Sequence, residues 1–215
     1  MDYARVRDGM VESQVRTNDV TDPRILHAMR TLPRERFVPA HKRALAYADA
    51  EAEVAPGRTL LRPRDLSKLI QALAPQAHEK ALEIAGATGY GAAVLAACCK
   101  EVVAHDPDAE LSRAARVAFE SCGIANAKTV STLAENGWKD EAPYDVILLN
   151  GGAEFVPEAW LDQLASGVRS VIVRQGAAGA ARIYTRAGNS SAYRIAFDAA
   201  PPVAPGLVRA ADFAF

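Results

Sequence analysis

The sequence lacks several features that would assign it to a class at once. No apolar run approaches the roughly 18 residues of a membrane-spanning helix, and the first residues contain no apolar segment typical of a secretion signal. Three cysteines occur, an odd number without the spacing of a disulfide framework or a zinc site, and the four histidines are scattered. We therefore expect a cytoplasmic protein without a resident metal.

An excess of charge of either sign is also missing. The 25 basic residues face 26 acidic ones, which leaves a formal net charge of −1 and does not favour binding to nucleic acid. Basic residues do cluster early, interleaved with acidic ones, and are expected on a solvated surface: Arg24, Arg30, Arg34, Arg36, Lys42 and Arg43. Half of the residues are hydrophobic, many of them alanine, which is sufficient for a core of helices packed closely on a sheet.

The chain divides by pattern into residues 1–78 and 79–215. The first part is charged, interrupted by prolines and helical in periodicity. A first helix is expected to end near Arg16, and a second to begin at Pro23, with Asp22 or Thr21 as its cap, and to end at Leu32-Pro33. A helical stretch follows Pro39 and runs through Tyr47. A loop or irregular strand over 55–63 and a helix over 64–73 complete this part. We predict a helical N-terminal extension.

The second part alternates short apolar strands with helices. The expected strands are 80–85, 101–106, 128–131, 145–150 and 169–174, and the expected helices are 91–99, 108–122 and 157–165. Two further strands, 182–185 and 193–199, are joined through Gly188-Asn189 as an antiparallel hairpin. This order predicts an α/β fold with a doubly wound, Rossmann-like parallel sheet that ends in an antiparallel pair.

The loop after the first predicted strand carries the strongest local signal. It reads Glu83-Ile84-Ala85-Gly86-Ala87-Thr88-Gly89-Tyr90, and its small residues allow a nucleotide to lie against the main chain. About 20 residues further on, the second strand ends at Asp106, where this class of fold places a carboxylate on ribose hydroxyls. Asp106 is equally placed to cap a helix that starts near Pro107. The glycine spacing of a nicotinamide-binding loop is absent, which disfavours a dehydrogenase.

Several segments together resemble the protein-L-isoaspartate O-methyltransferase family over nearly the whole chain. They are Met10-Val11-Glu12-Ser13-Gln14-Val15, Pro33-Arg34-Glu35-Arg36-Phe37-Val38-Pro39, Ala46-Tyr47-Ala48-Asp49, Ala81-Leu82-Glu83-Ile84 with Thr88-Gly89-Tyr90, Ala92-Ala93-Val94-Leu95-Ala96, and Ala142-Pro143-Tyr144-Asp145. The resemblance implies a methyltransferase sheet, S-adenosylmethionine as cofactor, and methylation of the free carboxylate of isoaspartyl or D-aspartyl residues in damaged proteins, which serves protein repair. Isoaspartyl peptides or proteins would be its partners.

The resemblance also implies site residues. Those for the cofactor are Glu83, Ala85, Gly86, Thr88, Gly89, Tyr90, Asp106, Thr132 and Leu133, and Thr59 is the candidate catalytic residue. Three departures from the family pattern stand out: Leu61 replaces a serine beside the transferring methyl group, Ala85 and Ala87 replace glycines, and Ser131-Thr132-Leu133 replaces Gly-Asp-Gly near the adenine. Arg58 or Arg62 is able to bind a substrate carboxylate, although both also fit a role as surface charges.

Three hypotheses follow from these residues. The first is an active carboxyl methyltransferase, for which most of the cofactor frame is retained. The second is a catalytically weakened or inactive relative that serves as a binding or regulatory module, which the substitutions at Leu61, Ala85, Ala87 and Thr132 favour. The third is a Rossmann-like protein that uses another nucleotide.

Overall fold

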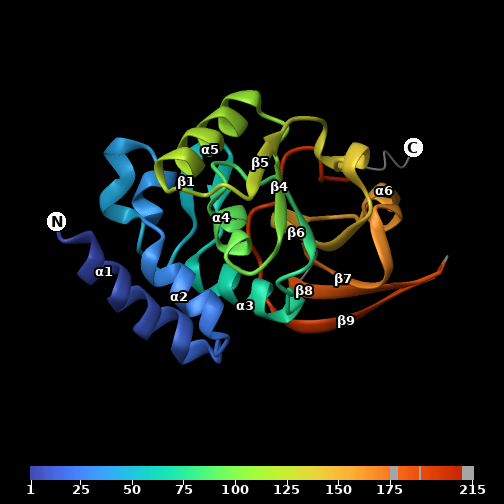
Figure 1. Cartoon of the computed structure of the whole chain (residues 1–215), viewed down its shortest axis with the longest axis horizontal. Coiled ribbons are helices and arrows are strands. Elements are labelled where there is room, and N and C mark those ends of the chain that lie inside the picture. The colour runs from blue at the N-terminus through green and yellow to red at the C-terminus, as the bar shows by residue number, and fades with distance from the viewer. Residues whose placement is uncertain (175–178, 189, 210–215) are drawn as a thin grey trace, which may run out of the picture.

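The centre of the computed structural model, which describes residues 1–174, 179–188 and 190–209, is a seven-stranded sheet (Figure 1). Its strands, in spatial order, are β5 (Ala127–Val130), β4 (Glu101–His105), β3 (Lys80–Ile84), β6 (Tyr144–Ala153), β7 (Leu164–Arg174), β8 (Ala180–Ala187) and β9 (Ser190–Asp198). The first five are parallel, and β8 and β9 continue the sheet as antiparallel neighbours. This confirms the predicted doubly wound sheet with a C-terminal hairpin.

The strand order reverses between β3 and β6. The chain runs outward from β3 through β4 to β5 and then returns to the other side of β3 as β6. In open parallel sheets, ligands bind beyond the carboxyl ends of the strands at such a reversal. The topology therefore directs attention to the segments that follow Ile84, His105 and the middle of β6.

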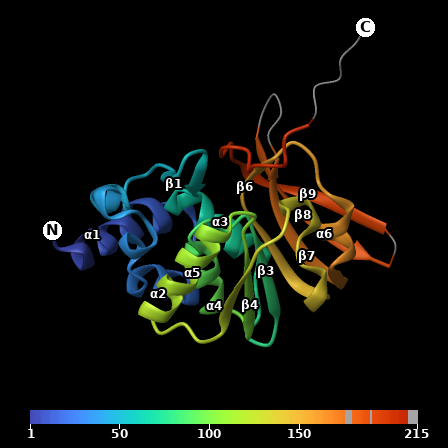
Figure 2. The same ribbon diagram turned by 90° about the horizontal axis from the view of Figure 1, so that it is seen from above.

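Helices cover both faces of the sheet. The helices packed on the sheet are α3 (Pro63–Leu73), α4 (Tyr90–Ala96), α5 (Ala109–Ser121) and α6 (Glu158–Asp162), whereas α1 (Tyr3–Met10) and α2 (Pro23–Thr31) pack mainly on other helices. The cartoon shows α4 and α5 on one side of the sheet and α6 on the other (Figure 2). Alternation along β3 explains the two layers, because Ala81 joins the core cluster of α3 to α5 while Leu82 joins the cluster around Trp160.

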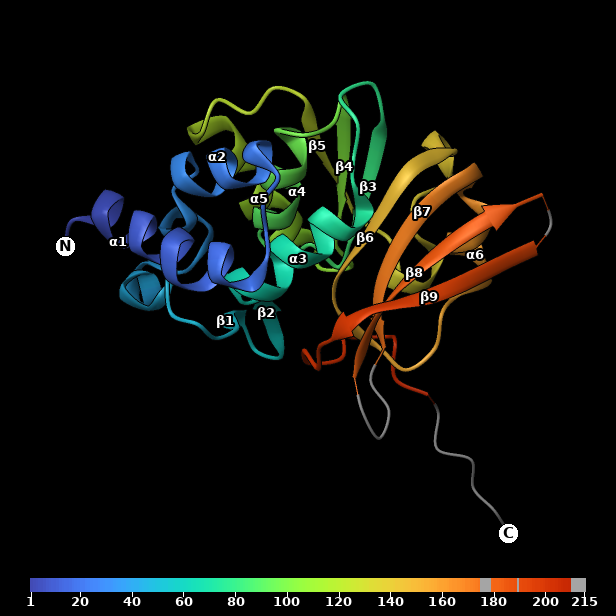
Figure 3. The same cartoon turned by 90° about the horizontal axis from the view of Figure 1, so that it is seen from below.

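The N-terminal part is helical, as predicted, and lies against the α3–α5 side of the sheet (Figure 3). Asp22 accepts the Arg24 N–H and Pro23 occupies the first turn of α2, which confirms that start. The first helix differs from the prediction: α1 ends at Met10, and helical structure continues as a π turn over 11–15 and a 3₁₀ turn to Asn18. Met10, Val11 and Val15 are buried along this segment.

Other boundaries also differ from the prediction. The stretch after Pro39 is a 3₁₀ helix (Ala40–Leu45), and residues 52–60 form a small hairpin of β1 (Ala52–Ala55) and β2 (Arg58–Leu60). The helix predicted over 157–165 spans only Glu158–Asp162, because Leu164 already pairs with Tyr144 as the start of β7.

Helix α4 and the C-terminal hairpin also differ in length from the prediction. Helix α4 ends at Ala96, so Cys98 and Cys99 lie buried in the turn after it rather than on it. The hairpin strands are longer than predicted and meet at Gly188, whose φ of 60° suits a tight turn, while Asn189 lies outside the described residues. Among the described helices, none has the length and apolar character to cross a membrane. The division at residue 78 stays a prediction.

Candidate functional site

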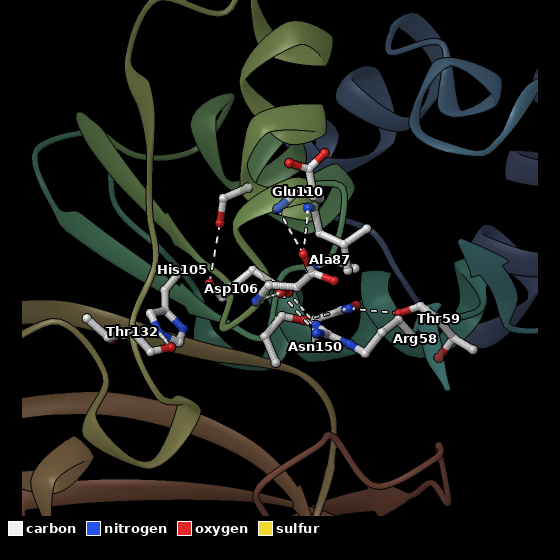
Figure 4. A network of polar contacts seen from close by, with 12 residues as sticks. Arg58, Thr59, Ala87, His105, Asp106, Glu110, Thr132 and Asn150 are labelled. Carbon is white, nitrogen blue, oxygen red and sulfur yellow. Dashed lines mark hydrogen bonds and ion pairs between the residues drawn. The ribbon is translucent and has the colours of Figure 1, made fainter. Parts of the chain in front are cut away.

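Four segments meet at the reversal of the strand order. The loop Ala85–Gly89 follows β3, Asp106 follows β4, Asn150 projects from β6, and the β1–β2 hairpin brings in Arg58 and Thr59 from the N-terminal part (Figure 4). Sequence analysis predicted the first two segments for a cofactor and Thr59 for catalysis. The structure brings all three together, within one hydrogen-bonded network.

Asp106 is the centre of this network and is almost completely buried, with 2% of its surface exposed. One carboxylate oxygen accepts the Ala87 N–H at 2.7 Å, and the other accepts the Asp108 N–H at 2.9 Å. The cap of α5 is Asp108, whose carboxylate accepts the Glu110 N–H and the Leu111 N–H. The capping role considered for Asp106 is therefore wrong, and its carboxylate faces the loop between β3 and α4.

Arg58 is the third partner of this carboxylate. Its Nη1 donates to Asp106 Oδ1 at 2.9 Å, its Nη2 pairs with Oδ2, and the same Nη2 lies 3.3 Å from the Ala85 carbonyl oxygen. The prediction of a surface charge is wrong for Arg58, which is only 7% exposed. Arg62 is partly buried and pairs with Glu51 and with Asp65. A solvated surface is also wrong for Arg34, which is fully buried.

Asn150 ties the hairpin to the loop. Its amide nitrogen donates to the carbonyl oxygens of Thr59 at 3.0 Å and Ala85 at 3.1 Å, and its oxygen accepts the Leu61 N–H at 3.3 Å. On the other side, the Leu61 carbonyl accepts from Arg34 at 2.8 Å. The segment 59–61 is thus held by side chains from two sides, while the Leu61 side chain itself is buried.

The two alanines of the loop adopt the left-handed backbone that glycine prefers, with φ of 55° at Ala85 and 53° at Ala87. This conformation costs each alanine about 1 kcal/mol or more. Both methyl groups are buried, that of Ala85 in the Trp160 cluster and that of Ala87 in the α3–α5 cluster. Burial of one methyl contributes about 0.8 kcal/mol, which largely offsets the strain. The loop therefore accommodates alanine at both positions at little net cost.

Glu83 lies beneath this loop and is fully buried. Its Oε2 accepts the Ala92 N–H at 2.9 Å, and its carboxyl group fills the space beside Gly86 and Gly91, where an added Cβ atom would collide with it. Burial raises the pKa of Glu83 to about 8, and the nearby charge of Asp106 adds to the effect. The carboxyl group is accordingly neutral at pH 7 and supports the loop from below.

Thr88 and Tyr90 connect the loop to the N-terminal part. The Thr88 hydroxyl donates to the Phe37 carbonyl, and the buried Tyr90 ring packs edge-on against the Phe37 ring. The Arg34 guanidinium lies over Tyr90, 4.6 Å from the ring centroid. Gly89 has a φ of 83° immediately before α4, a conformation that favours glycine.

The remaining predicted cofactor residues follow β5. The Thr132 hydroxyl donates to the Gly137 carbonyl at 2.8 Å, and His105 Nε2 lies within 3.0 Å of both Thr132 oxygens. Burial lowers the pKa of His105. Thr132 also lines a cavity of about 580 Å³ together with Trp138. Leu133 is 62% exposed.

Sequence reasoning missed two participants, Asn150 and the pairing of Arg58 with Asp106. Asn150 was detectable in principle, since it lies at the expected end of a predicted strand whose carboxyl edge coincides with the site. The arginine lies 48 positions before its partner in the sequence, without a periodic relation to it. Within the part of the chain that the structure describes, no three His, Cys, Asp or Glu side chains are grouped to hold a metal ion.

Comparison with known proteins identifies the family of this chain. Residues 6–195 match the model of the family described as protein-L-isoaspartate(D-aspartate) O-methyltransferase. A protein-L-isoaspartate O-methyltransferase of Methylorubrum populi is 39% identical over 171 residues, which cover 80% of this chain and 79% of that protein. One from Rhodopseudomonas palustris is 36% identical over 170 residues, covering 79% and 69%.

Solved structures share the fold. A protein-L-isoaspartate O-methyltransferase superposes with a TM-score of 0.80 at 23% identity, covering 93% of this chain and 66% of that one. A candidate β-aspartate methyltransferase of Plasmodium falciparum, in complex with S-adenosyl-L-homocysteine, gives 0.78 at 15% identity, covering 92% and 97%. With the match over residues 6–195 and the sequence identities above, the chain belongs to the protein-L-isoaspartate(D-aspartate) O-methyltransferase family.

Proposed function

We propose that this protein is an S-adenosylmethionine-dependent carboxyl O-methyltransferase that acts on isoaspartyl or D-aspartyl residues of damaged proteins and so serves protein repair. The observation that carries this function is the family match over residues 6–195, which includes both the hairpin and the cofactor loop. The structure supports it by bringing Asp106, the loop Ala85–Gly89 and Thr59 to one edge of the sheet.

The residues at this edge fit S-adenosylmethionine. Asp106 is a carboxylate at the position where this class of fold binds a ribose diol, and Ala85 and Ala87 adopt the left-handed backbone that glycine prefers. We assign Asp106 to the ribose and the loop residues Ala85, Gly86 and Gly89 to the amino-acid portion. Thr132 and Leu133 are assigned to the adenine side, and Glu83, Thr88 and Tyr90 hold the loop in shape.

The chemistry requires little from the protein beyond binding and alignment. Bound S-adenosylmethionine supplies a methyl group on a positively charged sulfur atom. Transfer of that methyl group to an acceptor carboxylate oxygen would leave S-adenosylhomocysteine and would require no proton transfer. Because a carboxyl group of pKa about 4 is already ionised at pH 7, no general base is needed. In-line alignment then supplies much of the rate.

Residues 1–78 would shape the cleft for the flexible peptide acceptor. Thr59 is our candidate for contact with the acceptor, since Asn150 holds its backbone beside the cofactor loop. Leu61 offers no polar atom on its side chain, so the serine of the family pattern has no equivalent there. We expect slower turnover than in relatives that keep the serine. We further propose a cytoplasmic location, which three free cysteines support.

One observation favours the second candidate function, a binding or regulatory module without turnover. Arg58 occupies the carboxylate that the cofactor needs, and it is buried together with that carboxylate. An ion pair of this kind lowers the affinity for the cofactor, since the cofactor must displace it.

Calorimetric titration with S-adenosylhomocysteine and a methyl-transfer assay on an isoaspartyl peptide decide between the two candidates. Binding with transfer supports the enzyme, and binding without transfer supports the module. Absence of binding at millimolar ligand contradicts the enzyme and leaves the module. Leu61→Ser provides a second arm, because a gain in methyl transfer by this variant shows that the missing hydroxyl limits the reaction. A Leu60→Ser variant, which changes the neighbouring buried leucine, serves as the matched control.

A further inference from the structure

The ion pair between Arg58 and Asp106 is the most unusual feature of the site. Both side chains are buried, and the contact is bidentate, with one guanidinium nitrogen on each carboxylate oxygen (Figure 4). Such a geometry gives strong, directional binding of a carboxylate. Arg58 opens β2, so this contact also links the N-terminal hairpin to the end of β4.

The Asp106 carboxylate has no capacity left for a further donor. A carboxylate accepts about four hydrogen bonds, and here two come from Arg58, one from the Ala87 N–H and one from the Asp108 N–H. The two backbone donors are fixed by the loop and by the start of α5. The hydroxyl groups of a ribose can therefore be accepted only when the guanidinium leaves.

A displaced Arg58 needs another anion. Among the described residues, Asp106 is the acidic side chain with which Arg58 forms an ion pair, and a buried cation without a partner is strongly unfavourable. The Ala85 carbonyl, 3.3 Å from Nη2, is a neutral acceptor that Asn150 also uses. The guanidinium thus contacts the cofactor loop from the residue that directly precedes Thr59, our candidate for contact with the acceptor.

The acceptor of the proposed reaction is itself a carboxylate. We propose that Arg58 is a specificity residue that changes partners: it binds Asp106 in the free protein and the carboxylate of the isoaspartyl acceptor when the cofactor ribose has taken Asp106. This inference rests on the proposed function. Monodentate contact to one acceptor oxygen leaves the other oxygen free for the methyl group.

The exchange couples the two ligands. The cofactor binds weakly by itself because it must leave Arg58 unpaired, and an acceptor carboxylate removes that cost. Each ligand consequently raises the affinity for the other by the same factor, which for coupled sites is typically about 5-fold to 150-fold. A neutral peptide provides no such gain.

The test is calorimetry on the full chain with S-adenosylhomocysteine, alone and with an isoaspartyl peptide or its amidated, uncharged analogue. We expect the peptide to tighten binding at least about 5-fold and the amide to leave it unchanged. In Arg58→Met and Arg58→Gln, S-adenosylhomocysteine alone binds more tightly than to the unmodified protein, and the effect of the peptide is lost. Arg116→Met, which alters an exposed arginine paired with Glu120 on α5, retains the behaviour of the unmodified protein.

Two results overturn the exchange, and they are distinguishable. If S-adenosylhomocysteine binds the unmodified protein equally well with and without the charged peptide, Arg58 does not change partners, whereas the proposed function stands. If neither the unmodified protein nor the Arg58 variants bind it at millimolar concentration, the proposed function fails as well. The comparison of charged and amidated peptide uses only the unmodified protein, so it decides the matter even if both variants fold poorly.

Discussion

Glu83→Gln is expected to change how the stability of this protein depends on pH. The carboxyl group of Glu83 is fully buried, which raises its pKa to about 8 from an ordinary value of 4.5. Between these two values the folded protein keeps a proton that the unfolded chain has released. The free energy of unfolding then falls as pH rises, by at most about 1.4 kcal/mol per pH unit from this group.

Glutamine has nearly the same shape and carries no charge at any of these pH values. Its side-chain oxygen is able to accept the Ala92 N–H as Glu83 does at 2.9 Å. The difference in free energy of unfolding between variant and unmodified protein should therefore grow in favour of glutamine from pH 5 toward pH 8. Above pH about 8 Glu83 is ionised in both the folded and the unfolded state of the unmodified protein, so the difference levels off.

Urea unfolding of the ligand-free protein at pH 5, 6, 7, 8 and 9, followed by circular dichroism, measures this difference. Glu110→Gln is the control, because Glu110 is exposed on α5 and paired with Arg113. We expect that control to stay within about 0.5 kcal/mol of the unmodified protein at every pH. A constant difference for Glu83→Gln across the whole range would refute the reasoning, since it would mean that burial does not raise the pKa of Glu83 above its value in the unfolded chain.

Three further substitutions test the packing around the site. Gly91→Ala adds a methyl group against the Glu83 carboxyl group and should lower the free energy of unfolding in urea by about 1–3 kcal/mol. Asp108→Ala removes the cap of α5 and should cost about 1 kcal/mol, seen as a lower melting temperature in calorimetry. Ala87→Gly exchanges backbone strain for a lost buried methyl group, so its unfolding free energy in urea should change by less than about 1 kcal/mol.

Each of these has an outcome that contradicts it. Gly9→Ala is the matched control for Gly91→Ala, because a Cβ atom at Gly9 meets nothing within 4 Å and alanine favours the helix; equal effects of the two substitutions would show that Glu83 does not fill that space. An unchanged melting temperature for Asp108→Ala would show that the cap contributes nothing. A loss of several kcal/mol in Ala87→Gly would show that the methyl group matters far more than its area suggests.

Local sequence patterns determined most of the fold. Asp22 and Pro23 mark the start of α2 by their own chemistry, and the alternation of short apolar runs with helical periodicity predicts the parallel sheet. These features depend on neighbours within a few residues, so a single sequence displays them. The placement of Asp106 at a carboxyl edge follows in the same way, because parallel strands end on one side.

Contacts between distant segments decided the rest. Helix α6 is shorter than its sequence pattern because Leu164 pairs with Tyr144. The Ala85 and Ala87 methyl groups point into the core, which only the packed sheet reveals.

Ion pairing and protonation in the site also depend on the tertiary structure. In the sequence, Arg58 fits a surface charge. In the folded protein, the hairpin places it beside Asp106, which lies 48 positions further along the chain. Glu83 holds its proton only because the assembled core excludes water from its carboxyl group. The sequence by itself therefore predicted the edge of the sheet at which we propose that the cofactor binds, since loop composition and the ends of strands are local signals. The tertiary structure alone decided which charge occupies that place, because burial and ion pairing arise only when distant segments pack together.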